Sequence, residues 1–155
     1  MGPREAQSLD DLEKAEEALK GGALTIAVVK GGKLIFSAKI PGLKAIFMAY
    51  KALGGELAGS SVADKVVGRA AALLYAHHGV RAVFGAIMSE GAAAVLRDNG
   101  MGLKFDGLVP EIKGKDGMQT CPFERAVMDI SEPEEAARAI SRILPDAIAA
   151  SESGT

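Results

Sequence analysis

Two short motifs carry side chains that could do chemistry, and each stands at the start of a predicted helix. The first begins with Asp64 and Lys65 and opens a predicted helix over about residues 64–78. The second holds Cys121, the only cysteine in the chain, and Glu124 follows it three residues later. The first turn of a helix presents unpaired backbone N–H groups and a partial positive charge, which favour carboxylates, anions and thiolates. If the two helix starts converge, they form a polar pocket.

Asp64 and Lys65 admit two interpretations. In the functional one, Asp64 is a general base or a ligand anchor and Lys65 is its electrostatic partner. In the structural one, Asp64 caps the helix and Lys65 is solvated, which is the commonest use of such residues. Gly68 lies in the interior of this predicted helix, where glycine costs about 1 kcal/mol relative to Ala. That cost indicates a close approach by sheet backbone or by a ligand.

Cys121 is a candidate nucleophile, because the helix dipole and nearby cations favour the thiolate. Lys113 and Lys115 lie in the preceding loop, which could close over a phosphate or a carboxylate, and Glu124 could transfer protons. The alternative is a buried cysteine that packs as a small apolar side chain. The sequence supports these two interpretations about equally.

Three further polar residues are candidate ligand contacts. Ser89 and Glu90 directly follow an apolar strand predicted over residues 80–88, and Ser61 precedes the Asp64 helix. In open α/β sheets, ligands bind beyond the carboxyl ends of the strands. We therefore expect these residues to line a ligand site with the two loop lysines, the alternative being ordinary helix capping.

Composition bounds the protein class. The chain has 155 residues, 48% of them hydrophobic, and a net charge of −2. This favours one globular domain over residues 1–150, followed by a disordered tail at 151–155. The charge gives no reason to expect a nucleic-acid or membrane partner. A single cysteine and a polar, acidic start without signal-peptide character favour the cytoplasm.

The pattern of apolar residues and chain breakers gives the elements that must position these groups. Helices are predicted over about residues 8–20, 43–53, 64–78 and 91–98, with a short helix from Cys121 and a last one from Ser131 that Pro145 ends or kinks. Strands are predicted over about 24–29, 33–38, 80–88 and 103–109, with 60–63 as a brief strand or extended link. A hairpin at Gly31-Gly32, joined to later strands through helices, predicts a three-layer α/β/α sandwich with a mixed sheet.

The two motifs together resemble an uncharacterised family of unknown function that is placed in the cytidine-deaminase-like fold. They read D-K-V-V-G-R-A-A-A at 64–72 and C-P-F-E-R-A-V at 121–127, and the likeness spans about residues 12–144. The resemblance implies an α/β/α sandwich around a mixed sheet of about five strands. It also implies a pocket between the starts of the two helices that flank the central strand.

The zinc chemistry of the deaminases does not carry over with this resemblance. Those enzymes hold zinc with an H-x-E sequence and a P-C-x-x-C sequence. Here the corresponding helix starts hold Asp64 and Ser89, with no histidine and no pair of cysteines. His77 and His78 are adjacent on a helix, so they do not form the i, i+4 pair that binds a metal. We expect no metal, no cofactor and no zinc-dependent deamination.

Three functions follow from these observations. The leading expectation is a metal-free, deaminase-like pocket that binds a nucleotide-like or nucleoside-like small molecule. The first alternative is a zinc-independent enzyme with Cys121 as nucleophile and Asp64 or Glu124 as acid and base. The second is a structural subunit of a homo-oligomer, such as a homodimer.

Overall fold

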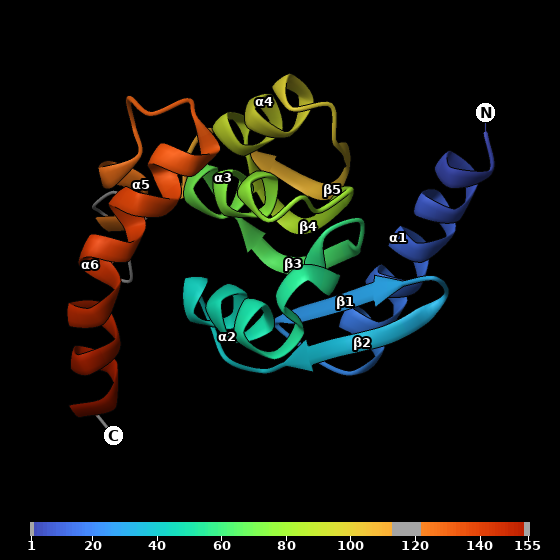
Figure 1. Cartoon of the computed structure of the whole chain (residues 1–155), viewed down its shortest axis with the longest axis horizontal. Helices are drawn as coiled ribbons and strands as arrows, with labels where there is room; N and C mark the ends of the chain where they lie inside the picture. Colours follow the sequence, from blue (N-terminus) through green and yellow to red (C-terminus); the bar gives the residue numbers. More distant parts are fainter. Residues whose placement is uncertain (1, 113–121, 154–155) are drawn as a thin grey trace.

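The computed structural model describes residues 2–112 and 122–153, with side chains described throughout except at positions 4, 5 and 144–153. A five-stranded sheet in the order β2-β1-β3-β4-β5 forms its centre (Figure 1). Strands β1 (Ile26–Lys30) and β2 (Lys33–Ala38) form an antiparallel hairpin, and β1 also pairs antiparallel with β3 (Ser61–Val67). Strands β3, β4 (Ala82–Ser89) and β5 (Gly102–Val109) run parallel. The predicted mixed sheet is confirmed.

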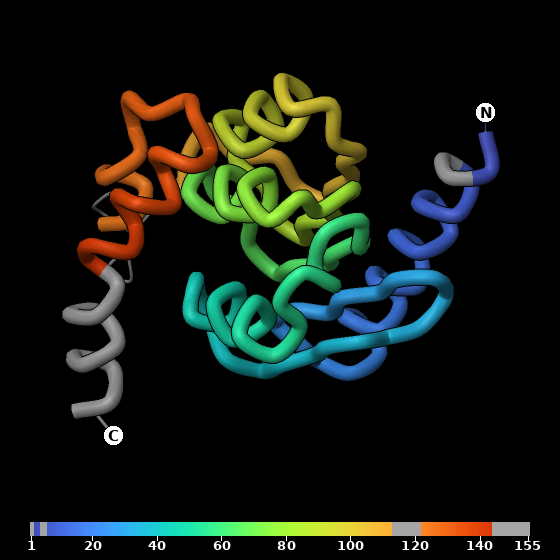
Figure 2. The backbone as a smooth tube through the Cα atoms, in the orientation of Figure 1, coloured from blue at the N-terminus to red at the C-terminus, as the bar shows by residue number. Residues whose placement is uncertain are grey.

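Helices cover both faces of this sheet, as Figures 1 and 2 show. Helix α1 (Pro3–Gly21) lies alone on one face. The other face carries α2 (Leu43–Leu53), the short 3-10 helix η1 (Gly54–Leu57), α3 (Arg69–His77) and α4 (Glu90–Asp98). Helices α5 (Pro122–Ala126) and α6 (Pro133–Ser153) follow β5, and α6 packs against α3. The architecture is the predicted three-layer α/β/α sandwich.

Two apolar layers hold the sandwich together. Beneath α1, Leu12 and Leu19 are buried with Val29 and Phe84 of the sheet. On the opposite face, small side chains of α3 and α4 are buried with the larger ones of several elements, among them Ile46, Leu73, Leu96 and Ile140. Ile140 comes from α6, so the start of α6 contributes to the core.

The largest difference from the sequence-based prediction is at residues 64–67. These residues continue strand β3 instead of opening a helix, and α3 begins only at Arg69. Asp64 pairs with Ile26 of β1 on one side and with Gly85 of β4 on the other. Three β-branched valines within the strand favour this conformation. Gly68 is therefore the N-cap residue of α3 and does not lie in a helix interior.

Other elements follow local signals closely. Helix α2 has the predicted bounds, the turn at Gly31-Gly32 has the positive φ values that a tight hairpin needs, and Ser89 caps α4 as predicted. The two ends of the chain differ from the prediction. Helix α1 starts at Pro3, five residues earlier than predicted, and α6 continues past Pro145 to Ser153, whereas the sequence favoured a disordered tail from residue 151. No helix in the described part of the chain is both long and apolar enough to cross a bilayer.

Asp11 joins α1 to the hairpin. Its side chain is buried (3% exposed), and its carboxylate accepts the backbone N–H groups of Gly31 at 3.0 Å and Gly32 at 2.9 Å. The side-chain amide of Gln7 donates a third bond at 2.8 Å. A buried carboxylate is tolerated only when it is hydrogen-bonded in this way. Asp11 therefore fixes the turn against the helix.

We predict that Asp11→Ala lowers the free energy of unfolding by about 1–3 kcal/mol, because the two N–H donors of the hairpin turn lose their charged partner. Urea denaturation followed by circular dichroism measures this loss. Asp10→Ala is the matched control, since Asp10 is exposed and its ion pair with Lys14, at 3.5 Å, is exposed as well. Equal unfolding midpoints for the two variants would contradict the role of Asp11.

Candidate functional site

The start of α3 holds the carboxylate of Glu124. The backbone N–H of Arg69 donates to Oε2 of Glu124 at 3.0 Å, and the N–H of Ala70 donates to Oε1 at 3.1 Å. The N-cap residue Gly68 contributes no side-chain cap of its own. A carboxylate at this position also matches the positive end of the helix dipole. Glu124 therefore caps α3 from a distant part of the chain.

Gly68 makes this contact sterically feasible. A Cβ atom on Gly68 would lie 2.1 Å from Oε1 and 2.8 Å from Cδ of Glu124. Any larger residue would push the carboxylate off the helix. Burial raises the pKa of Glu124 above its ordinary value, against the opposing effect of the two N–H donors and of the Arg69 charge. Only glycine leaves room for the cap.

The side chain of Arg69 makes a second connection, from α3 to the segment that follows α5. Its Nε donates to the carbonyl of Val127 at 3.1 Å, and Nη2 donates to the carbonyl of Ile130. Both carbonyls belong to the segment between α5 and α6. The two sequence motifs are therefore in contact through Arg69 and Ala70 on one side and Glu124 and Val127 on the other. Their contact is a reciprocal link between α3 and the chain that leads into α6.

The neighbouring helix start is also occupied by the protein itself. Ser89 is buried (3% exposed), and its hydroxyl accepts the N–H of Ala92 at 3.0 Å, which caps α4. A Cβ on Gly91 would lie 3.8 Å from Cβ of Arg69, so the starts of α3 and α4 lie side by side. Glu90, the first residue of α4, is exposed. The expected site between the helix starts is largely filled by capping groups.

Asp64 forms a separate pair with Tyr75 of α3. The Tyr75 hydroxyl donates to Oδ2 of Asp64 at 2.6 Å, and the N–H of Val66 donates to Oδ1 at 3.3 Å. Burial raises the pKa of Asp64 to about 7, and the hydrogen bond from Tyr75 is the main opposing effect. Burial and then the Asp64 charge raise the pKa of Tyr75 well above its ordinary value. None of the described hydrogen bonds joins the Asp64 carboxylate to the side chain of Lys65 or of Glu124.

The remaining predicted residues lie elsewhere. Lys65 is exposed within β3, and its backbone N–H bonds to the carbonyl of Thr25 at 3.1 Å. Ser61 lies at the opposite end of β3 from the α3 start, and its hydroxyl donates to the carbonyl of Ser8 at 3.2 Å. The structure therefore does not bring Ser61 to the helix starts. The other three candidates lie outside the described residues: Lys113, Lys115 and Cys121.

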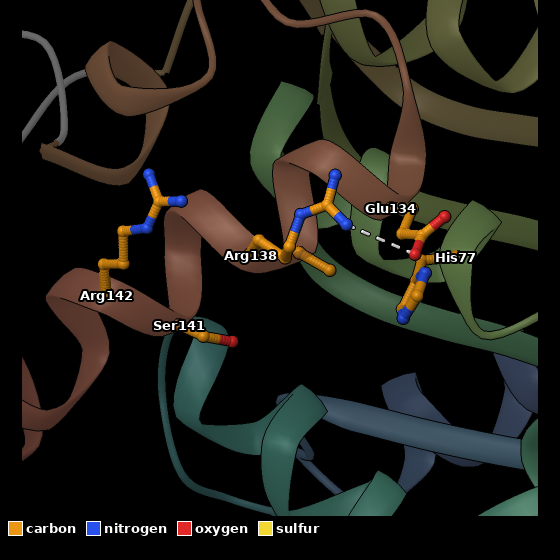
Figure 3. Close-up of a pocket in the computed structure, with 6 residues that line it drawn as sticks. His77, Glu134, Arg138, Ser141 and Arg142 are labelled. Atoms are coloured by element: carbon orange, nitrogen blue, oxygen red, sulfur yellow. Dashed lines mark hydrogen bonds and ion pairs between the residues drawn. The ribbon is translucent and has the colours of Figure 1, made fainter.

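A groove between the end of α3 and the exposed side of α6 was not found from the sequence. It has a volume of about 430 Å³ and is lined by His77, Glu134, Ala137, Arg138, Ser141 and Arg142. Figure 3 shows these side chains, with Arg138 bonded to Glu134 at 3.3 Å. The i, i+4 spacing of the two arginines is a visible signal for one face of a helix. Their meeting with His77 depends on the packing of α6 against α3.

The second histidine, His78, is not among the residues that line this groove, although its ring centroid lies 5.1 Å from that of His77. The ring of His78 stacks on Tyr50 of α2 with a centroid distance of 4.3 Å. Burial, with a smaller effect from His77, lowers the pKa of His78 to about 4, so this residue is neutral at pH 7. Within the residues that the structure describes, no three His, Cys, Asp or Glu side chains gather in a way that could hold a metal ion.

Comparisons with known proteins give two groups of matches. The model of the TM1506 family, a domain of unknown function (DUF1893), matches residues 14–144. The structure of the DUF1893 protein TM1506 from Thermotoga maritima is 30% identical, with a TM-score of 0.78 over 86% of this chain and 89% of its own. Two forms of Acinetobacter baumannii RibD are 16% and 17% identical, with TM-scores of 0.47 and 0.44 over 64% of this chain and 35% of the RibD chain. No curated protein matches this chain.

We predict that Gly68→Ala lowers the free energy of unfolding by about 1–2 kcal/mol, the usual range for a lost helix cap. The added methyl group displaces the Glu124 carboxylate from both N–H donors. Gly91→Ala is the control, because a Cβ there has no neighbour closer than 3.8 Å and Ala favours a helix. Denaturant unfolding of both variants tests this, and a Gly68→Ala protein as stable as Gly91→Ala would refute it.

We predict that Asp64 makes stability fall as the pH rises. The folded state holds this proton up to a pKa of about 7, whereas the ordinary value is 3.8. Ionisation therefore costs the folded state more than the unfolded one, so the contribution of Asp64 to stability decreases between about pH 4 and pH 7 and then levels off. The lowered pKa of His78 acts in the opposite direction over this range, so the expected effect is a difference between the variant and the wild type. Asp64→Asn should therefore gain stability relative to the wild type as the pH rises, and be the more stable protein at pH 8.

Thermal unfolding measured from pH 4 to pH 8 checks this expectation. Asp129→Asn, a change at an exposed carboxylate, is the control that should keep the wild-type slope. Parallel profiles for the wild type and Asp64→Asn would show that burial of Asp64 has no energetic effect.

Proposed function

Because the chain belongs to the TM1506 family, which is described only as a domain of unknown function, we propose a function from the chemistry of its surface. The protein binds a nucleotide-like small molecule in the groove between α3 and α6. The observation that carries this proposal is the convergence of two guanidinium groups, an imidazole and a hydroxyl on one cavity. The binding needs no metal ligand from the chain.

The size and chemistry of the groove support this class of ligand. A volume of about 430 Å³ falls within the roughly 300–1,000 Å³ range of small-molecule sites. Arg138 and Arg142 are donors suited to phosphate oxygens, and Ser141 and His77 can bond the polar edges of a sugar or base. Nucleotides present all of these acceptors on one molecule.

The starts of α3 and α4 are already occupied by groups of the protein itself, and this favours the groove as the place where a ligand binds. The first N–H groups of α3 bond to Glu124, an N–H group of α4 bonds to Ser89, and Asp64 bonds to Tyr75. A ligand at this place would first have to break contacts that stabilise the fold. The groove requires no such change, since its polar side chains are exposed and the ion pair described among them is an exposed one.

Thermal unfolding with a panel of nucleoside monophosphates tests the proposal. We expect the melting temperature to rise with ligand concentration, since binding adds RT ln(1 + [L]/Kd), or about 2.7 kcal/mol at 100 times Kd. The double variant Arg138→Ala/Arg142→Ala should lose the response. Arg81→Ala/Arg97→Ala removes the same charge from exposed positions elsewhere and should retain it.

Two results would contradict the proposal. One is a panel in which no nucleotide raises the melting temperature. The other is an equal rise for the wild type and for the Arg138→Ala/Arg142→Ala variant, which would place binding outside the groove.

A further inference from the structure

The two arginines are arranged for one anionic group. Arg138 and Arg142 are four residues apart on α6, so their side chains leave the same face of the helix and line the same groove. Each planar guanidinium can donate two parallel bonds to phosphate or carboxylate oxygens. Two such groups on one face match a doubly charged phosphate better than a neutral ring.

The groove offers little for recognition of a base. Of the described residues that line it, Ala137 is the one apolar side chain. Base recognition in proteins gains most from large aromatic or apolar surfaces on which the base stacks. A nucleotide bound here would therefore owe its affinity to its phosphate.

The Glu134 carboxylate competes with an anionic ligand for Arg138. Its carboxylate bonds to Nη1 of Arg138 at 3.3 Å, with both side chains exposed (74% and 62%). Exposed ion pairs of this kind contribute little to stability, so an incoming anion can replace the carboxylate. The displaced Glu134 then repels the bound phosphate, which limits affinity.

We propose that the groove is specific for phosphomonoesters, an inference that rests on the proposed function. The phosphate binds to Arg138 and Arg142 and displaces Glu134 from Arg138. The remainder of the ligand lies along the groove without a stacking contact. Glu134 is thus a determinant of affinity that the protein carries within its own site.

Isothermal titration with AMP, ribose 5-phosphate and adenosine tests this specificity. We expect AMP and ribose 5-phosphate to bind with comparable affinity, and adenosine to bind about tenfold or more weakly, because it lacks the charged contacts. Added salt should weaken binding of both phosphate compounds.

Three variants separate the roles of the side chains in AMP binding. Arg142→Ala should weaken AMP binding about tenfold. Glu134→Gln should strengthen it by about two- to fivefold, since the competing charge is removed. Arg97→Ala, an exposed arginine on α4, should leave it unchanged.

The outcomes distinguish the two proposals. Adenosine binding as tightly as AMP would overturn phosphate specificity and leave nucleotide binding in place. Weaker or unchanged AMP binding by Glu134→Gln would overturn the role of Glu134. Failure of AMP, ribose 5-phosphate and adenosine alike to bind the wild type would overturn the proposed function itself.

Discussion

The contact between the Glu124 carboxylate and the first N–H groups of α3 is the constraint on which the arrangement of α3, α5 and α6 depends. It joins residues 54 and 55 positions apart in the chain. The contact requires glycine at position 68, because any Cβ would overlap the carboxylate. Arg69 closes the link by bonding to the carbonyls of Val127 and Ile130. Since these carbonyls lie in the segment between α5 and α6, the same contacts hold the chain that leads into α6 beside α3.

This link changes the interpretation of the polar residues at the helix starts. A carboxylate and a serine hydroxyl satisfy N–H groups of α3 and α4 that would otherwise attract an anionic ligand. Asp64 is bonded to Tyr75, so its carboxylate belongs to a hydrogen-bonded pair that joins β3 to α3. Exposed polar groups of α6 and of the end of α3 line the groove instead. The groove with Arg138 and Arg142 lies where α6 packs against α3, next to this link.

Local signals were sufficient for much of the fold. The hairpin at Gly31-Gly32, helix α2, strand β5 and the Ser89 cap each follow from residues within a few positions. Residues 64–67 could not be assigned in this way, because an acidic residue before an alanine run also fits a helix start. Pairing with β1 and β4 makes these residues a strand, and that pairing joins segments that are distant in the sequence. The partner of Glu124 and the approach of His77 to α6 likewise depend on packing between distant segments, which periodicity does not reveal.

Amide hydrogen exchange at Arg69 and Ala70 tests the central link most directly. The account predicts that both amides are protected in the wild type and exchange markedly faster in Glu124→Ala, while the amide of Ala92, which Ser89 caps, keeps its rate. Unchanged exchange at Arg69 and Ala70 in Glu124→Ala would contradict it, since the carboxylate would then not be the group that holds the start of α3.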